Sequence, residues 1–126
     1  MYTVYLKENE MISENHFPVI ALLNEAANSD IVEFVNNLNQ GIGSGFDYSD
    51  CTFWNELDEY DKSNIPHYEG LLFSTEDDDE VIVGYSDLLI YLNIICEKLQ
   101  ADNYSRIIEL NEQINLFRRN YLKASS

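Results

Sequence analysis

Residues 67–84 read HYEGLLFSTEDDDEVIVG, and this stretch decides the fold. Residues 67–74 are rich in β-forming side chains and predict one strand, and residues 80–84 predict a second. The charged connection between them, residues 75–79, is too short for a crossover, so the two strands must pair antiparallel. Gly70 within the first strand indicates a bulge or a close approach of two backbone segments. The stretch therefore predicts an antiparallel β-hairpin.

The N-terminal third of the chain has the periodicity of a helix. Apolar side chains recur three and four positions apart over residues 17–28, and Pro18 is tolerated in a first helical turn. Asn24 and Glu25 are expected on the opposite, polar face of this helix.

A second apolar stripe follows after a short break. Asp30 and Glu33 have the spacing of a capping box, and residues 31–38 repeat apolar side chains at helical intervals. Gly41 is a plausible end for this helix. The pattern allows either one broken helix or two short ones.

Helices also follow the hairpin. Ser86 is expected to cap a helix over residues 87–100, whose wide apolar stripe is typical of a helix lying on a sheet. A helix restarting at residues 102–103 and running to Tyr121 has a narrower apolar seam. Together they predict a C-terminal helical hairpin.

The remaining segments complete the expected fold. Residues 2–6 alternate and predict a short strand, residues 46–49 and 51–54 predict strand pieces, and residues 55–65 predict a polar loop. The chain is expected to form one domain over residues 1–126, in the α+β class. Its small antiparallel sheet would pack against N-terminal helices and a C-terminal helical hairpin.

Negative charge is concentrated in one segment of the chain. The 126 residues carry a net charge of -16, and Asp47 to Asp87 hold 13 acidic residues against the single cation Lys62. Such a charge distribution disfavours nucleic acid and anionic membranes as partners and favours a basic protein surface. Aromatic side chains are interleaved with the acids, and aromatics anchor interfaces while charge speeds encounter. The candidate contact residues are Asp47, Asp50, Trp54, Glu56, Asp58, Glu59, Tyr60, Asp61, Tyr68, Asp77, Asp78, Asp79 and Glu80.

Chemistry-bearing motifs are weak by comparison. His16 and His67 have no Ser, Cys or carboxylate partner at a recognisable spacing, so no catalytic residue is predicted. The acids of residues 76–80 fail the alternate spacing and central glycine of a calcium loop. The glycines of residues 41–45 lack the Lys-Ser/Thr ending of a phosphate-binding loop. Neither a metal site nor a cofactor is expected, and an enzyme is the least favoured class.

The cellular context follows from what the sequence lacks. No N-terminal apolar targeting segment and no apolar run long enough to span a bilayer is present, so we expect a cytoplasmic protein. Cys51 and Cys96 are far apart and are expected to be reduced thiols, although the sequence leaves a disulfide open.

Four motifs occur in a recognisable order. They are Cys-Thr-Phe at 51–53, Tyr-Glu-Gly-Leu-Leu-Phe-Ser at 68–74, Glu-Val-Ile-Val at 80–83 and Tyr-Leu-Asn-Ile-Ile-Cys-Glu-Lys at 91–98. This series resembles the immunity proteins of contact-dependent growth inhibition systems, in particular the group that counters ribonuclease toxins. The resemblance covers residues 41–100.

The resemblance implies a non-enzymatic, cytoplasmic protein that binds the C-terminal toxin domain delivered by a neighbouring bacterium and blocks its nuclease activity, expected to be an RNase. Its motifs favour packing roles for Cys51, Gly70, Phe73 and Cys96. Trp54 stands where the family pattern has proline. The expected function is therefore binding of a basic toxin face through the acidic, aromatic segment. The alternatives are a nucleic-acid mimic that regulates another enzyme, an adaptor for another basic partner, and a surface whose acids serve only solubility.

Overall fold

The structure is a computed structural model that describes residues 2–122. Alternating burial along its strands shows which face of the sheet points to the core. The strands are β1 (Ser44–Gly45), β2 (Ser49–Phe53), β3 (Leu71–Thr75) and β4 (Glu80–Val83), and they form one antiparallel sheet in the order β1-β2-β3-β4. Every second side chain is buried on the helical side, namely Ser49, Cys51, Phe53, Leu71, Phe73, Thr75, Val81 and Val83. The predicted hairpin and its antiparallel pairing are confirmed, but its first strand covers Leu71–Thr75 rather than residues 67–74.

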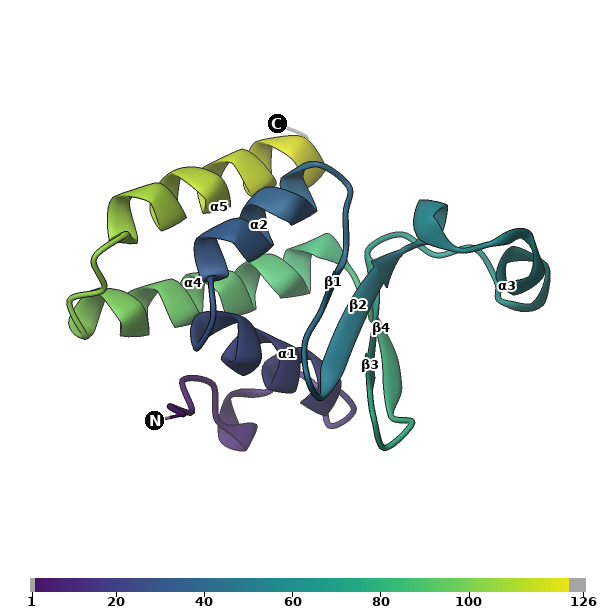
Figure 1. The fold of residues 1–126 in the computed structure, drawn as a ribbon, viewed down its shortest axis with the longest axis horizontal. Helices are drawn as coiled ribbons and strands as arrows, with labels where there is room; N and C mark the ends of the chain where they lie inside the picture. Colours follow the sequence, from purple (N-terminus) through teal and green to yellow (C-terminus); the bar gives the residue numbers. More distant parts are fainter. Residues whose placement is uncertain (1, 123–126) are drawn as a thin grey trace.

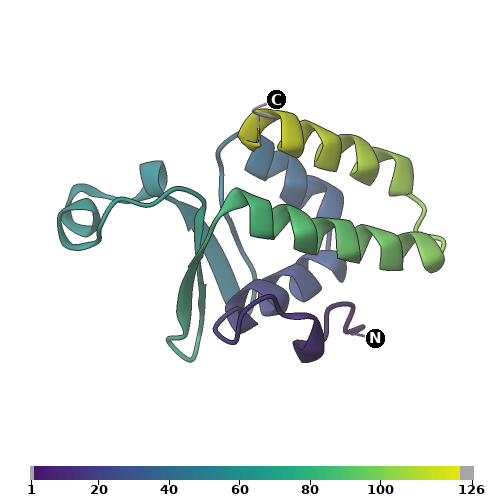
Figure 2. The same cartoon turned by 180° about the vertical axis from the view of Figure 1, so that it is seen from behind.

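Helices cover one face of this sheet (Figures 1 and 2). They are α1 (Phe17–Ala27), α2 (Ile31–Asn39), α4 (Tyr85–Ala101) and α5 (Ile107–Tyr121). α1 contacts β2, β3 and β4 directly, while α5 packs against α2 and α4. Fully buried Phe34, Tyr91 and Phe117 fill the space between the helices. The α+β class, the N-terminal helices and the C-terminal helical hairpin are confirmed. Within the described residues, no helix is both long and apolar enough to cross a membrane.

Local signals fix the ends of α2. The Asp30 side chain accepts a hydrogen bond from the Glu33 backbone N–H at 3.0 Å, as its capping spacing predicts. At the other end Gly41 has φ +76°, and the N–H groups of Gly41 and Ile42 donate to Leu38 and Asn37. This pair of bonds is the Schellman arrangement, which requires a left-handed residue after the helix. The first third of the chain is thus two helices rather than one broken helix.

The predicted strand at residues 2–6 is wrong. The segment runs beside α1 instead, where Asn24 Oδ1 accepts from the N–H groups of Tyr5 (2.9 Å) and Leu6 (2.8 Å), and Asn24 Nδ2 donates to the Leu6 carbonyl (3.0 Å). One side chain therefore satisfies the backbone groups that a neighbouring strand would otherwise pair. Asn24 is also buried rather than on the polar face that the periodicity predicted.

The predicted loop at residues 55–65 contains a short helix, α3 (Glu59–Asn64), after the 3-10 turn η2 (Trp54–Glu56). Asp58 caps α3 by accepting from the Asp61 N–H at 2.8 Å, a local bond that stabilises a helix despite the polar sequence. A second 3-10 turn, η1, spans Glu8–Glu10.

Boundaries differ elsewhere as well. Residues 46–48 form a turn rather than a strand, so the two predicted strand pieces are a single strand, β2. Gly84, rather than Ser86, stands at the N-cap of α4, because the chain enters the helix directly from β4. α5 starts at Ile107, since Asn103 takes the left-handed φ of +58° and interrupts the helix there.

Gly70 meets the sequence expectation of a close backbone approach. Its φ is +100°, and a Cβ atom at this position would lie 2.1 Å from the Val83 carbonyl oxygen. Only glycine fits this combination of dihedral and space. The residue lets the chain pass from the 54–70 segment into β3.

Candidate partner-binding surface

The sheet has one face without helices. Its side chains form two cross-strand rows: Asp50, Ser74 and Glu80 are neighbours in one, and Thr52, Leu72 and Ile82 in the other. Helices α1, α2, α4 and α5 all lie on the opposite side of the sheet (Figures 1 and 2). Asp50 accepts a hydrogen bond from the Ser74 hydroxyl at 2.6 Å, while Ile82 is 45% exposed. We call this surface the open face.

One end of the open face is strongly acidic. The turn between β3 and β4 presents Asp77, Asp78 and Asp79, all exposed, and Asp47 is exposed in the adjoining turn between β1 and β2. The Tyr48 hydroxyl joins the two turns by donating to Asp77 Oδ2 at 2.7 Å, and this bond raises the pKa of Tyr48. We call these four acids the acidic turn.

The opposite end of the sheet carries a projecting arm, residues 54–70 (Figure 1). Asp58, Glu59 and Asp61 surround the first turn of α3, and we call them the arm acids. Tyr60 on the same helix is 75% exposed. An exposed aromatic ring beside carboxylates has the composition of an interface anchor.

Other predicted contact residues hold the base of the arm together. The Trp54 ring meets His67 and Tyr68 edge-on, with ring centroids 4.9 Å and 5.6 Å away. Tyr68 is buried, its hydroxyl donates to the Thr52 carbonyl at 3.0 Å, and burial raises its pKa to about 12. Glu56 Oε1 accepts from the N–H groups of Gly43 and Phe53, both at 2.9 Å. Trp54, Glu56 and Tyr68 therefore have evident structural roles.

The predicted contact residues thus fall into separate groups on the structure. The acidic turn and the arm acids lie at opposite ends of β2, whose five residues span about 13 Å. Asp50 and Glu80 lie on the open face, at the end next to the acidic turn. No strand of the sheet contains Lys or Arg, and Lys62 is the one such residue between positions 41 and 97. A surface whose charges are nearly all negative is complementary to a basic partner.

Three of the four cysteine and histidine side chains are buried. Both cysteines are buried free thiols; burial raises the pKa of Cys51 to about 12 and also raises that of Cys96. Such thiols are inert as nucleophiles. His16 is buried at the start of α1 with Nδ1 2.8 Å from the Tyr91 hydroxyl, while His67 is exposed beside Trp54. Over residues 2–122, no group of three His, Cys, Asp or Glu side chains has the arrangement of a metal site.

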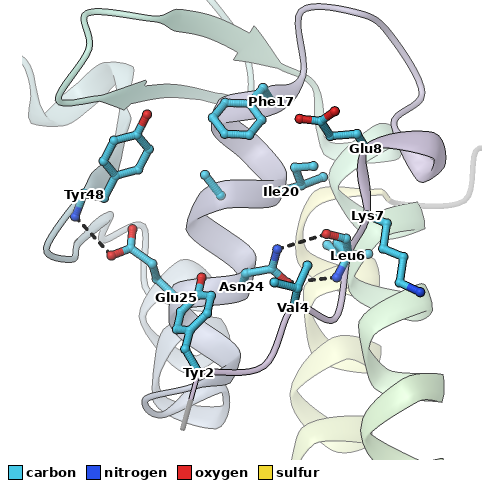
Figure 3. A pocket seen from close by; sticks show the side chains of 11 residues that line it. Tyr2, Val4, Leu6, Lys7, Glu8, Phe17, Ile20, Asn24, Glu25 and Tyr48 are labelled. Atoms are coloured by element: carbon cyan, nitrogen blue, oxygen red, sulfur yellow. Dashed lines mark hydrogen bonds between the residues drawn. The ribbon is translucent and has the colours of Figure 1, made fainter.

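The structure contains a pocket that was not predicted from the sequence. A pocket of about 630 Å³ lies between residues 2–8, α1 and the turn that carries Tyr48 (Figure 3). The assignment of residues 2–6 to a strand concealed it. The available signal was the pair Asn24 and Glu25 in an otherwise apolar helix, because a polar side chain there needs partners from another segment.

Comparison with known protein families gives a match over most of the chain. Residues 8–114 match the family model described as "CDI immunity protein", where CDI denotes contact-dependent growth inhibition. The matched range includes α1 to α4, the whole sheet and the first half of α5. No curated protein matches the chain.

Proposed function

The chain belongs to the CDI immunity protein family, whose members have a cognate toxin as partner, and we propose that it neutralises a nuclease toxin domain, an RNase, by binding it in the cytoplasm. The protein acts by binding and catalyses no reaction. The family match is the observation that supports a toxin as the partner. The surface described above supplies the argument for the chemistry of that partner.

Charge supports a basic toxin face. A nuclease must attract a phosphate backbone, so the surface around its active site carries Lys and Arg. The acidic turn, Asp50 and Glu80 present carboxylates along one end of the open face, and the arm acids add three more at the other end. Complementary fields of this kind accelerate encounter and exclude wrongly charged partners.

The composition of the open face also supports contact through it. Leu72 and Ile82, with Thr52 beside them, give this face an apolar patch, with carboxylates toward both ends. Interfaces commonly combine such an apolar centre with a charged rim. The exposed Tyr60 ring beside the arm acids supports a further contact with the same partner.

The test uses the purified chain and the purified toxin domain encoded beside it. The proposal predicts that the chain binds this domain and stops its cleavage of RNA, while leaving an unrelated RNase active. If the chain binds the domain but RNA cleavage is undiminished, the proposal that it neutralises the toxin is wrong. If the toxin domain cleaves DNA and the chain stops that cleavage, the immunity role stands and the toxin's substrate is DNA rather than RNA.

A further inference from the structure

The residues that line the pocket beside α1 include none of the predicted contact residues. Its wall comes from the N-terminal segment, its floor from α1, and its far edge from Tyr48 (Figure 3). A volume of about 630 Å³ is within the range of ligand-binding clefts. The lining residues are Tyr2, Val4, Leu6, Lys7, Glu8, Phe17, Ile20, Ala21, Asn24, Glu25 and Tyr48.

The wall of the pocket is held in place before any ligand arrives. Asn24 makes three hydrogen bonds to the backbone of Tyr5 and Leu6, and Asn28 makes two to Thr3, at 2.8 Å and 2.7 Å. These bonds fix the N-terminal segment at a set distance from α1. A preorganised pocket loses little conformational entropy when it binds.

A carboxylate with spare capacity lies in this pocket. Glu25 accepts one hydrogen bond at each oxygen, from the Tyr48 N–H at 3.0 Å and from the Ser49 hydroxyl. A carboxylate has about four acceptor sites, so roughly half remain available. Across residues 2–122, no ion pair involves Glu25. Glu8 adds a second carboxylate, while the Lys7 ammonium points away from the pocket (Figure 3).

Aromatic rings flank this carboxylate. Figure 3 shows Tyr2 and Tyr48 on either side of Glu25, with Phe17 further along the pocket. Partial burial and the charge of Glu25 both raise the pKa of Tyr2, consistent with a nearby ring. Tyrosine faces attract cations, and a carboxylate between two such rings strengthens the attraction.

We propose that this pocket receives a lysine or arginine side chain from the toxin domain, with the charged head at Glu25 between Tyr2 and Tyr48. The aliphatic stem then lies on the apolar floor of Ile20 and Ala21, as long cationic side chains do. The inference rests on the proposed function and adds a second contact region to it.

The pocket and the acidic turn are parts of one continuous surface. Tyr48 lines the pocket, and its hydroxyl donates to Asp77 of the acidic turn. One basic face can therefore contact both. A second copy of this chain is a poor occupant, because two molecules of net charge -16 repel each other.

The direct test is a titration of the protein with argininamide, followed through its backbone amide NMR signals. Citrullinamide, which has the same shape without the charge, is the control ligand. The proposal predicts saturable shifts confined to the pocket residues with argininamide and a response about tenfold weaker with citrullinamide. Equal responses to both ligands, or shifts spread over the arm and the helices, would overturn it.

A blocking substitution connects the pocket with the toxin. Ala21→Trp fills the pocket floor, and Ala101→Trp places the same side chain at an exposed site at the end of α4. We expect Ala21→Trp to abolish the argininamide shifts and weaken toxin binding about tenfold, with wild-type values for Ala101→Trp. Unchanged toxin affinity of folded Ala21→Trp overturns this inference while the proposed function stands. If the wild-type protein binds no toxin, the proposed function fails, and the toxin is excluded as the source of the cationic side chain. The argininamide titration then still decides whether the pocket binds a cation.

Discussion

Removing charge from the acidic turn gives the sharpest prediction about how the partner is found. The change is Asp77→Asn, Asp78→Asn and Asp79→Asn in one protein. Asparagine keeps an acceptor for the Tyr48 hydroxyl, and it tolerates the left-handed φ of +65° at position 78. The substitution therefore removes three charges, from -16 to -13, while preserving the turn.

The expected magnitude follows from Coulomb's law in water. A unit charge about 8 Å from an opposite charge contributes roughly 0.5 kcal/mol, and screening at about 0.15 M salt reduces this to roughly 0.2 kcal/mol. Three such charges contribute about 0.6 kcal/mol, so association with the toxin should slow about threefold. At about 0.01 M salt the same charges contribute roughly 1.2 kcal/mol, or about eightfold.

Stopped-flow association rates over a range of salt concentrations measure this effect. The matched control replaces Glu97, Asp102 and Glu112 by their amides, which gives the same net charge of -13 from exposed sites on α4, on α5 and between them. The structure predicts near wild-type association for the control, because α4 and α5 lie on the side of the sheet opposite the open face (Figure 1). Equal slowing by both proteins would show that net charge alone matters and would refute the role of the acidic turn.

The remaining predictions concern the arm and the stability of the N-terminal half. Neutralising the three arm acids with Asn and Gln should slow toxin association about threefold and flatten its salt dependence, by the same arithmetic, measured in the same apparatus. Asn24→Ala removes three hydrogen bonds, two of them buried and one partly buried, so we expect a loss of about 2–4 kcal/mol in the free energy of unfolding, measured by denaturant titration. Glu10 pairs with Lys98, and hydrogen bonding to this ammonium lowers the pKa of Glu10 below its usual 4.5. The pair therefore stabilises the protein above about pH 4.5, and its contribution is lost as the pH falls through the lowered pKa. Glu10→Gln should lower the melting temperature at neutral pH and leave it unchanged in acid.

Each of these has an outcome that contradicts it. An unchanged association rate at low salt would remove the arm from the encounter surface. For Asn24, the matched control is Asn93→Ala on the exposed side of α4, expected to change stability by less than about 0.5 kcal/mol; similar losses in both variants would show that Asn24 does not hold the N-terminal segment. A pH-independent effect of Glu10→Gln would exclude its ion pair with Lys98 as the cause.

Local interactions explain what could be predicted from the sequence. The β3–β4 hairpin depends on a short charged turn between β-rich runs, and α2 depends on Asp30 at its start and Gly41 at its end. These signals act over a few residues, so a linear pattern contains them. The acidic composition of the candidate surface was equally readable, since charge is a property of the sequence itself.

Long-range contacts explain what could not. Asn24 bonds to backbone eighteen and nineteen positions away, which a helical pattern cannot reveal. Tyr68 was predicted as a contact residue for the partner, and the fold buries it with its hydroxyl bonded to the Thr52 carbonyl. The division of the acids between two ends of the sheet likewise depends on strand pairing. The pocket at Glu25 exists only because a non-helical N-terminal segment docks on α1.

The most direct test of neutralisation is a titration of the toxin domain's RNA cleavage with the purified chain. The account predicts that the initial rate falls in proportion to added protein and reaches the background at about one equivalent, as expected when protein and toxin are far above their dissociation constant. The unrelated RNase in the same buffer should keep its full rate. RNA cleavage that continues undiminished with the chain in excess would contradict the account.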